Sequence, residues 1–241
     1  AAWGGTLLHM NEFYKAGLFR GLHFRLSCFV LKSASLIFVP AENLVSLYQK
    51  YYDVDPKKIV LVPNPLPNNI VSSVFFEATR PTILFAGRFV AYKNLSRVIG
   101  ACRDLAKKYR FNLRLIGDGP ELSNLSKYRE PWLEIIPGLS HRELIKEINN
   151  ASICIAPALT EFAPNFILEC AVAEKAVAIS SNHGLAKSVI EIPPEAQFDP
   201  LSVIEIKNVL KHLLDSPIMP KLNSWSWDNV ILLQIKKIQE L

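Results

Sequence analysis

Long apolar runs are missing from this sequence of 241 residues. The longest candidate, between Leu18 and Val39, is interrupted by Arg20, His23, Arg25 and Lys32. Because a membrane-spanning helix needs about 18 or more consecutive apolar residues, we expect none here. No internal repeat, low-complexity tract or signal-peptide pattern is present. The sequence begins AAWGG without an initiator Met, so we expect further sequence upstream.

Cysteine is scarce as well, and its four occurrences lack C-x-x-C spacing: Cys28, Cys102, Cys154 and Cys170. Their isolation in apolar surroundings predicts buried free thiols in a reducing compartment. The G-x-G-x-x-G fingerprint of dinucleotide-binding enzymes is also missing, since IGDGPEL at residues 116–122 has the glycines but not the spacing. A nicotinamide-linked dehydrogenase is therefore a distant alternative.

The composition indicates a folded protein with anionic partners. Half of the residues are hydrophobic and a fifth are charged, which suffices for one large core or two smaller ones and argues against disorder. The formal charge of +5 favours phosphates, nucleic acid or acidic membrane surfaces. Aromatic and basic residues do not alternate, so nucleic acid is not an expected partner.

Short apolar runs alternate with helix-length stretches along the chain. This alternation predicts β-α-β units and an α/β fold with a doubly wound parallel sheet. The expected strands cover residues 35–39, 59–62, 82–87, 113–117, 152–157 and 176–180. The expected helices cover residues 43–51, 94–109, 142–150, 164–173 and 201–214.

The segment VPNPLPNN at residues 62–69 has three prolines and no periodicity, which is typical of a linker. We therefore expect an incomplete unit over residues 1–64 and a complete doubly wound domain over residues 65–223. A last helix is predicted within residues 224–241, capped by Ser226 and packed on a neighbour through Val230, Leu233, Ile238 and Leu241. Residues 19–30 have apolar side chains at helical spacing beside Arg20 and Arg25, which favours a core helix over a membrane-facing one.

Chemistry-bearing residues follow the strand expected at residues 82–87. Gly87, Arg88 and Lys93 stand between its end and the next helix, at the edge where open α/β sheets bind ligands. Glycine allows close backbone approach, while the two cations suit phosphate oxygens. A basic surface turn explains the same residues equally well in isolation.

Two carboxylates follow the strand expected at residues 152–157, in TEFAPNFILEC. Alone, Glu161 and Glu169 could be a loop acid and an acid on a solvated helix face. A helix that begins at Pro164 would, however, direct its free amides to the same sheet edge, where they favour an anion. Cations and amides suit a diphosphate and carboxylates suit sugar hydroxyls, so the combination predicts a nucleotide-sugar site.

Six segments of the sequence, taken in order, resemble those of a known family. They are FVPAENLVSLYQKYYDVDPKKIVLVPNPL, ILFAGRFVAYKNLSRVI, LRLIGDGPEL, IIPGLSHREL, SICIAPALTEFAPNFILECAVAEKAVAIS and the terminal WSWDNV. They resemble the C-terminal half of GT-B glycosyltransferases, specifically the large family of retaining enzymes usually numbered four. The resemblance covers about residues 35–241. It implies that residues 1–64 end an acceptor-side Rossmann-like domain, that residues 65–223 bind the donor, and that the last helix crosses back to the first domain.

The resemblance implies an activity as well. The expected reaction is transfer of a hexose, with retention, from a UDP- or GDP-type donor to a glycan or lipid-linked acceptor in cell-envelope polysaccharide biosynthesis. These enzymes generally need no metal cofactor, and fixed cations with helix amides can offset the leaving-group charge. A cytoplasmic enzyme, peripheral at the inner face of the membrane, is expected. The alternative is a non-catalytic nucleotide-sugar-binding module.

By position, the resemblance assigns the diphosphate and the leaving nucleotide to Arg88 and Lys93, the transferred sugar to Glu161 and the ribose to Glu169. Further donor contacts are implied for Gly87, Gly117, Gly138, Leu139, Ala163, Pro164, Asn165 and Phe166. His9 stands where the family often has a histidine at the reaction centre, although an ordinary histidine at a strand end is equally open.

The sequence departs from the family pattern at three places. Phe162-Ala163 replaces the usual Gly-Phe and is expected to put bulk near the sugar. Residues 173–176 (AEKA) replace Cys-Gly-Lys-Pro, in what we expect to be a surface turn, and Lys187 stands where a glutamate is common. The D-x-D pattern of Asp53 and Asp55 favours a surface turn over a metal site.

Overall fold

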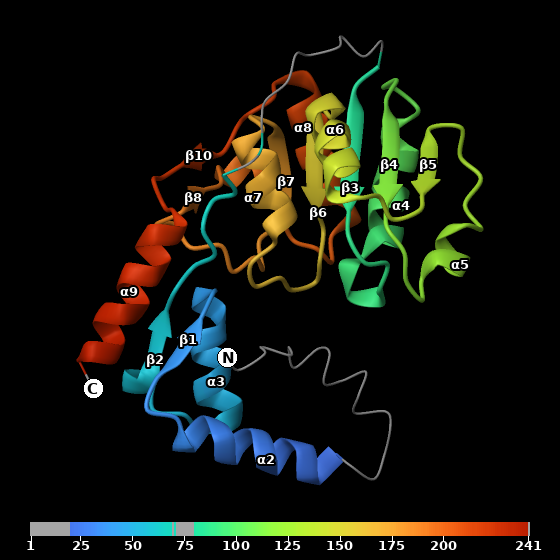
Figure 1. Cartoon of the computed structure of the whole chain (residues 1–241). Coiled ribbons are helices and arrows are strands. Elements are labelled where there is room, and N and C mark those ends of the chain that lie inside the picture. Colours follow the sequence, from blue (N-terminus) through green and yellow to red (C-terminus); the bar gives the residue numbers. More distant parts are fainter. Residues whose placement is uncertain (1–19, 69, 71–79, 241) are drawn as a thin grey trace.

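The computed structural model describes residues 20–68, 70 and 80–240 (Figure 1). The helices are α2 (Arg20–Ser33), α3 (Glu42–Tyr52), α4 (Leu95–Leu105), α5 (Leu122–Leu125), α6 (His141–Asn150), α7 (Asn165–Val172), α8 (Val203–Asp215) and α9 (Trp227–Gln239). The strands are β1 (Ile37–Val39), β2 (Ile59–Leu61), β3 (Thr82–Ala86), β4 (Asn112–Ile116), β5 (Leu133–Ile136), β6 (Ile153–Ala156), β7 (Ala176–Ser180), β8 (Ile190–Glu191), β9 (Gln197–Phe198) and β10 (Lys221–Leu222).

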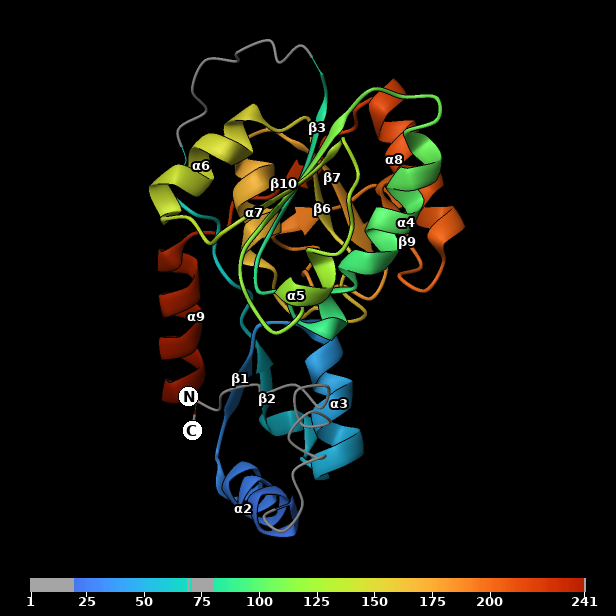
Figure 2. The same cartoon turned by 90° about the vertical axis from the view of Figure 1, so that its right-hand side faces the viewer.

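A six-stranded parallel sheet organises the larger part of the chain. Its strand order is β5-β4-β3-β6-β7-β9, and every pairing is parallel. The chain builds outward from β3 in one direction and then returns to begin again at β6, so the order reverses between these two neighbours. Helices α4 and α8 cover one face of the sheet and α6 and α7 cover the other (Figures 1 and 2). The predicted doubly wound parallel sheet is confirmed.

Alternation along the strands divides the core into two layers. Ile83 and Phe85 pack with the side chains of α4 and α8, whereas Leu84 between them packs with those of α6 and α7. This is the two-residue period of a strand that is covered on both faces. The cysteines fit the prediction at three positions, because Cys102, Cys154 and Cys170 are buried and free, while Cys28 is free and half-buried.

A smaller unit precedes this sheet. Strands β1 and β2 form a two-stranded parallel sheet that packs with α2 and α3 around its own hydrophobic cluster, which includes Leu31 and Val39. We call residues 20–61 the N-terminal unit. The prediction that residues 19–30 form a core helix is wrong for two of its apolar residues, because Leu26 and Phe29 of α2 are 55% and 70% exposed. The helix turns Phe24 toward the cluster instead.

Helix α9 begins at the predicted cap. The Ser226 side chain accepts from the backbone N–H of Asn229 in a capping box, and α9 then runs toward the N-terminal unit (Figure 2). Val230 is buried as expected, but Ile238 is 54% exposed. The indole N–H of Trp225 donates to the carbonyl of Pro63 at 3.1 Å, which ties the start of α9 to the chain that follows β2. None of the described helices has the length and apolarity required to cross a membrane.

Candidate functional site

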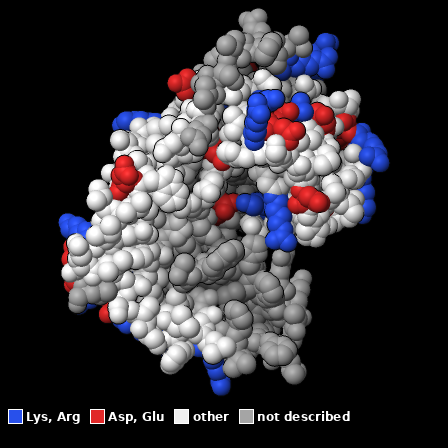
Figure 3. Space-filling view, viewed as in Figure 1, with Lys and Arg blue, Asp and Glu red and all other residues white. Residues whose placement is uncertain are grey.

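The carboxyl ends of β3 and β6 frame a pocket of about 220 Å³. These strands are neighbours at the point where the strand order reverses, which is where open α/β sheets bind ligands. In the space-filling view, acidic and basic side chains adjoin a hollow on this face (Figure 3). The lining includes six of the predicted site residues: Lys93, Glu161, Ala163, Pro164, Asn165 and Phe166. The structure therefore brings together residues that lie far apart in the sequence.

The two predicted site charges pair with each other across this pocket. The ammonium group of Lys93 forms an ion pair and hydrogen bond with the carboxylate of Glu161. Their side chains are only 18% and 17% exposed, so the pair is shielded from water more than a surface ion pair would be. The ammonium also lies 5.4 Å from the centroid of the Tyr92 ring. A cation and a hydrogen-bond acceptor are thus available side by side.

Asn94 holds this arrangement, and sequence reasoning missed it. Its backbone is left-handed (φ 62°), a conformation that asparagine tolerates better than most residues. Its buried side-chain amide donates to the carbonyls of Pro157, at 3.1 Å, and Pro200, at 2.7 Å. These bonds connect the loop that carries Lys93 to the loop that follows β6. A lone asparagine before a helix gives no sequence signal for such long-range contacts.

Arg88 lies in the same loop and is exposed. Across the described ranges it forms no ion pair, so it is free to meet a ligand. The loop itself depends on glycine: a Cβ added to Gly117, where φ is +151°, would lie 1.9 Å from the carbonyl oxygen of Gly87. The backbone turns after β3 and β4 can approach this closely only because Gly117 has no side chain.

Helix α7 begins at the pocket. Pro164 is its N-cap residue and provides no side-chain hydrogen bond to the first turn. The backbone N–H of Ile167 donates to the carbonyl of Pro164 at 3.0 Å, so the N–H groups of Asn165 and Phe166 are the ones that need other partners, and the helix dipole favours a negative charge there. The side chain of Asn165 accepts a hydrogen bond from Asn64 at 2.8 Å, and Phe166 packs on Phe85 with ring centroids 6.4 Å apart.

Glu169 lies further along α7 and is 15% exposed. Its carboxylate oxygen Oε1 is 2.9 Å from Nε2 of His141, the first residue of α6 and another residue that sequence reasoning missed. Gly138 and Leu139 come shortly before His141 in the chain. Gly138 is exposed, with no atom within 4 Å of an added Cβ, while Leu139 packs partly into the core. The contact between His141 and Glu169 therefore brings α7 close to the segment that follows β5, although β4 and β3 separate β5 from β6 in the sheet.

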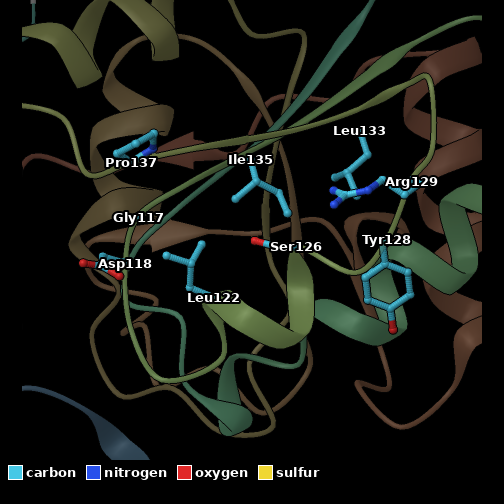
Figure 4. A pocket seen from close by; sticks show the side chains of 9 residues that line it. All are labelled: Gly117, Asp118, Leu122, Ser126, Tyr128, Arg129, Leu133, Ile135 and Pro137. Atoms are coloured by element: carbon cyan, nitrogen blue, oxygen red, sulfur yellow. The ribbon is translucent and has the colours of Figure 1, made fainter.

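A second, larger cavity of about 350 Å³ lies by β4, β5 and α5 (Figure 4). Asp118, Tyr128 and Arg129 are among its lining side chains, and Gly117 is the predicted site residue that it includes. The smaller cavity therefore holds both ion-paired residues and the larger one holds Gly117. The other predicted site residues that the structure describes line neither cavity: Gly87, Arg88, Gly138, Leu139 and Glu169.

Several further expectations have definite outcomes. Asp53 pairs with Lys32 at 2.7 Å and Asp55 caps the turn that follows, so the D-x-D pattern is a surface turn as expected. Within the described residues, no cluster of three or more His, Cys, Asp or Glu side chains could hold a metal. His9 lies outside the described residues. The expectation of a surface turn at residues 173–176 is wrong apart from Glu174, because Lys175 is buried and donates to the carbonyl of Asn149 at 2.7 Å.

A half-buried histidine, His183, lies in the loop after β7. Burial lowers the pKa of His183 below its usual value, and a hydrogen bond with Gln197 opposes this effect less strongly. Nδ1 of His183 accepts from the backbone N–H of Leu185 at 3.2 Å. The imidazole is thus favoured in its neutral form.

One comparison with known proteins identifies a family for this chain, and another identifies similar folds. The family model described as glycosyl transferases group 1 matches residues 68–226. No curated protein matches the chain in a sequence search. Among solved structures, similarity extends to the lipopolysaccharide outer core galactosyltransferase WaaB in its apo form (13% identity, TM-score 0.68, 86% of this chain and 63% of that chain). Sucrose-phosphate synthase from Thermosynechococcus elongatus is similar as well (18% identity, TM-score 0.71, 91% of this chain and 61% of that chain). So is WaaG, a glycosyltransferase involved in lipopolysaccharide biosynthesis (15% identity, TM-score 0.67, 85% of this chain and 60% of that chain).

These similarities concern the fold, because the sequence identities are low. The chain spans 60 to 63% of the length of these three structures. Together with the parallel sheet, they confirm the GT-B fold class predicted from the sequence.

Proposed function

The chain belongs to the family of glycosyl transferases group 1, and from this premise we propose that it binds a nucleoside diphosphate sugar between the ends of β3 and β6. The observation that carries the proposal is the ion pair of Lys93 and Glu161 in a pocket where α7 begins. A diphosphate needs cations and amides, whereas a sugar needs hydrogen-bond acceptors. This pocket offers both within the reach of one ligand.

In the proposed complex, the diphosphate lies against Arg88, Lys93 and the first amides of α7. As the bond to the sugar breaks, negative charge grows on the leaving phosphate, and these groups stabilise it without a resident metal. Release of Lys93 toward the phosphate frees the carboxylate of Glu161 to accept from sugar hydroxyls. Glu169 accepts from the ribose, and backbone groups at residues 138–139 meet the base.

The proposed reaction is transfer of a hexose, with retention, to a glycan or lipid-linked acceptor in cell-envelope polysaccharide synthesis. We further propose a cytoplasmic enzyme in peripheral contact with the inner face of the membrane. The exposed apolar side chains of α2 support this contact, since Leu26, Phe29 and Val30 are 55%, 70% and 60% exposed. Apolar side chains on a helix surface favour insertion at a membrane interface.

Calorimetric titration with UDP, GDP and their common hexose conjugates tests the proposal. We expect micromolar affinity for one base, unchanged when a chelator replaces magnesium in the buffer. ADP and AMP serve as controls for non-specific attraction to a basic protein. If UDP, GDP and their hexose conjugates all fail to bind, the proposed donor site is refuted. If binding requires the divalent ion, the metal-free part of the proposal is wrong.

A further inference from the structure

The loop that carries Glu161 is held by the N-terminal unit as well as by its own sheet. The side-chain amide of Asn43, in the first turn of α3, donates to the backbone carbonyl of Glu161 at 3.2 Å. These residues are separated by 118 positions in the sequence. The carboxylate of Glu161, in contrast, pairs with Lys93 in the pocket. One residue thus connects the N-terminal unit to the candidate site.

Phe162 strengthens this connection. Its neighbours Glu161 and Ala163 line the pocket, but Phe162 packs against the hydrophobic cluster of the N-terminal unit. The Phe162 side chain is thus directed toward the N-terminal unit and is not among the residues that line the pocket. Phe162 is half-buried, and its packing restrains the backbone on both sides of it, since moving the loop would expose more apolar surface to water.

Gly184 completes the contact from a third direction, the loop after β7. A Cβ added there would lie 2.5 Å from Oδ1 of Asn43, 2.6 Å from Cβ of Ala41 and 2.6 Å from the carbonyl oxygen of Phe162. Separations below about 3 Å are not tolerated between such atoms, so any larger residue would push the loops apart. The three segments can meet only because position 184 is glycine.

The hydrogen bonds of the Asn43 side chain are only partly satisfied at this junction. Oδ1 is buried and accepts no hydrogen bond from the part of the chain that the structure describes. A buried unpaired acceptor is unfavourable, so the bond donated to Glu161 is the contact that accounts for an asparagine here.

We propose that Asn43 is a positioning residue for Glu161, acting through the contact formed by Asn43, Phe162 and Gly184. The N-terminal unit thereby sets the direction of the carboxylate that recognises the transferred sugar. Arg88 and Glu169 are not part of this contact, and Lys93 is linked to it only through its ion pair with Glu161, so binding of the nucleoside diphosphate should depend on the contact much less than binding of the sugar. This inference rests on the proposed function for the identity of the ligand, but the ordering of the loop stands apart from it.

Two variants disturb the contact and two matched variants do not. Asn43→Ala removes the hydrogen bond, while Gln49→Ala removes an exposed amide from the same helix. Gly184→Ala forces the loops apart, while Gly100→Ala adds a methyl group in α4 whose nearest neighbour would be 3.9 Å away. The four proteins are compared with the unaltered chain in the same titrations.

The expected result is selective. Asn43→Ala and Gly184→Ala should weaken binding of the nucleoside diphosphate sugar by roughly threefold to tenfold, the effect of one lost hydrogen bond, with the affinity for the nucleoside diphosphate unchanged. Gln49→Ala and Gly100→Ala should change neither. Equal loss of both ligands in the first two variants would indicate general damage and overturn the positioning role. Unchanged affinity for both ligands would overturn it too.

Hydrogen exchange separates this inference from the proposed function. Deuterium uptake by the peptide over residues 158–166 should be faster in Asn43→Ala and Gly184→Ala than in their controls, without any ligand. Unchanged uptake would show that the contact does not order the loop and would refute the inference. Failure of the unaltered chain to bind any nucleotide would refute the proposed function and the sugar-directed role of Asn43, whereas faster uptake would still support its ordering of the loop.

Discussion

Replacing Arg88 by alanine separates ligand binding from folding more cleanly than any other change at the site. The side chain is exposed and forms no ion pair within the described ranges, so its loss should change the free energy of unfolding by less than about 0.5 kcal/mol. A charged hydrogen bond to phosphate contributes about 1.5–3 kcal/mol. The dissociation constant for the nucleoside diphosphate should therefore rise by roughly 10- to 150-fold.

The assay is calorimetric titration with the nucleoside diphosphate, accompanied by urea unfolding of each protein. Arg110→Ala is the matched control, because Arg110 is also exposed but precedes β4 at the opposite edge of the sheet. It should bind as the unaltered chain does. The reasoning fails if Arg88→Ala retains full affinity, or if its lost affinity is matched by lost stability.

Three further predictions concern the sugar, the backbone and pH. Glu161→Gln, which cannot form an ion pair with Lys93, should weaken binding of the nucleotide sugar by roughly tenfold without weakening binding of the nucleoside diphosphate. Titration of both ligands checks this, and equal weakening of both would contradict it. Gly117→Ala should lower the free energy of unfolding by about 2 kcal/mol or more in urea, because its Cβ would meet the carbonyl of Gly87 at a positive φ; an unchanged value would contradict the close approach. Burial lowers the pKa of His183 from 6.5, so the unfolded chain binds its proton first as pH falls. The free energy of unfolding should therefore decrease from about pH 7.5 to 5.5, and His183→Gln should reduce that decrease when urea unfolding is repeated across the range.

The sequence predicted the sheet well wherever strands are covered on both faces. The run at residues 176–180 coincides with β7, and all five of its residues are buried. Strand β5 was not expected, because it lies at the edge of the sheet and its four residues, 133–136, are half-buried or exposed. An edge strand has one neighbour and its side chains are less completely buried, so fewer of its positions require an apolar residue and its sequence shows less periodicity.

The part of the site that depends on local sequence was predicted, whereas the contacts between distant segments were not. Strand ends followed by Lys93 and Glu161 place both residues at one sheet edge, and the structure confirms that they meet. The direction of Phe162 depends instead on a hydrophobic cluster more than a hundred positions earlier in the chain. Neither that contact nor the bond between His141 and Glu169 leaves a pattern in the adjoining sequence.

The most direct test of the central claim is a crystal structure of this chain with the nucleoside diphosphate that it binds best. The account predicts the diphosphate between Arg88, Lys93 and the first turn of α7, with the ribose on Glu169 and the ion pair of Lys93 and Glu161 opened. A nucleotide bound instead in the larger cavity beside Asp118, Tyr128 and Arg129 would contradict it.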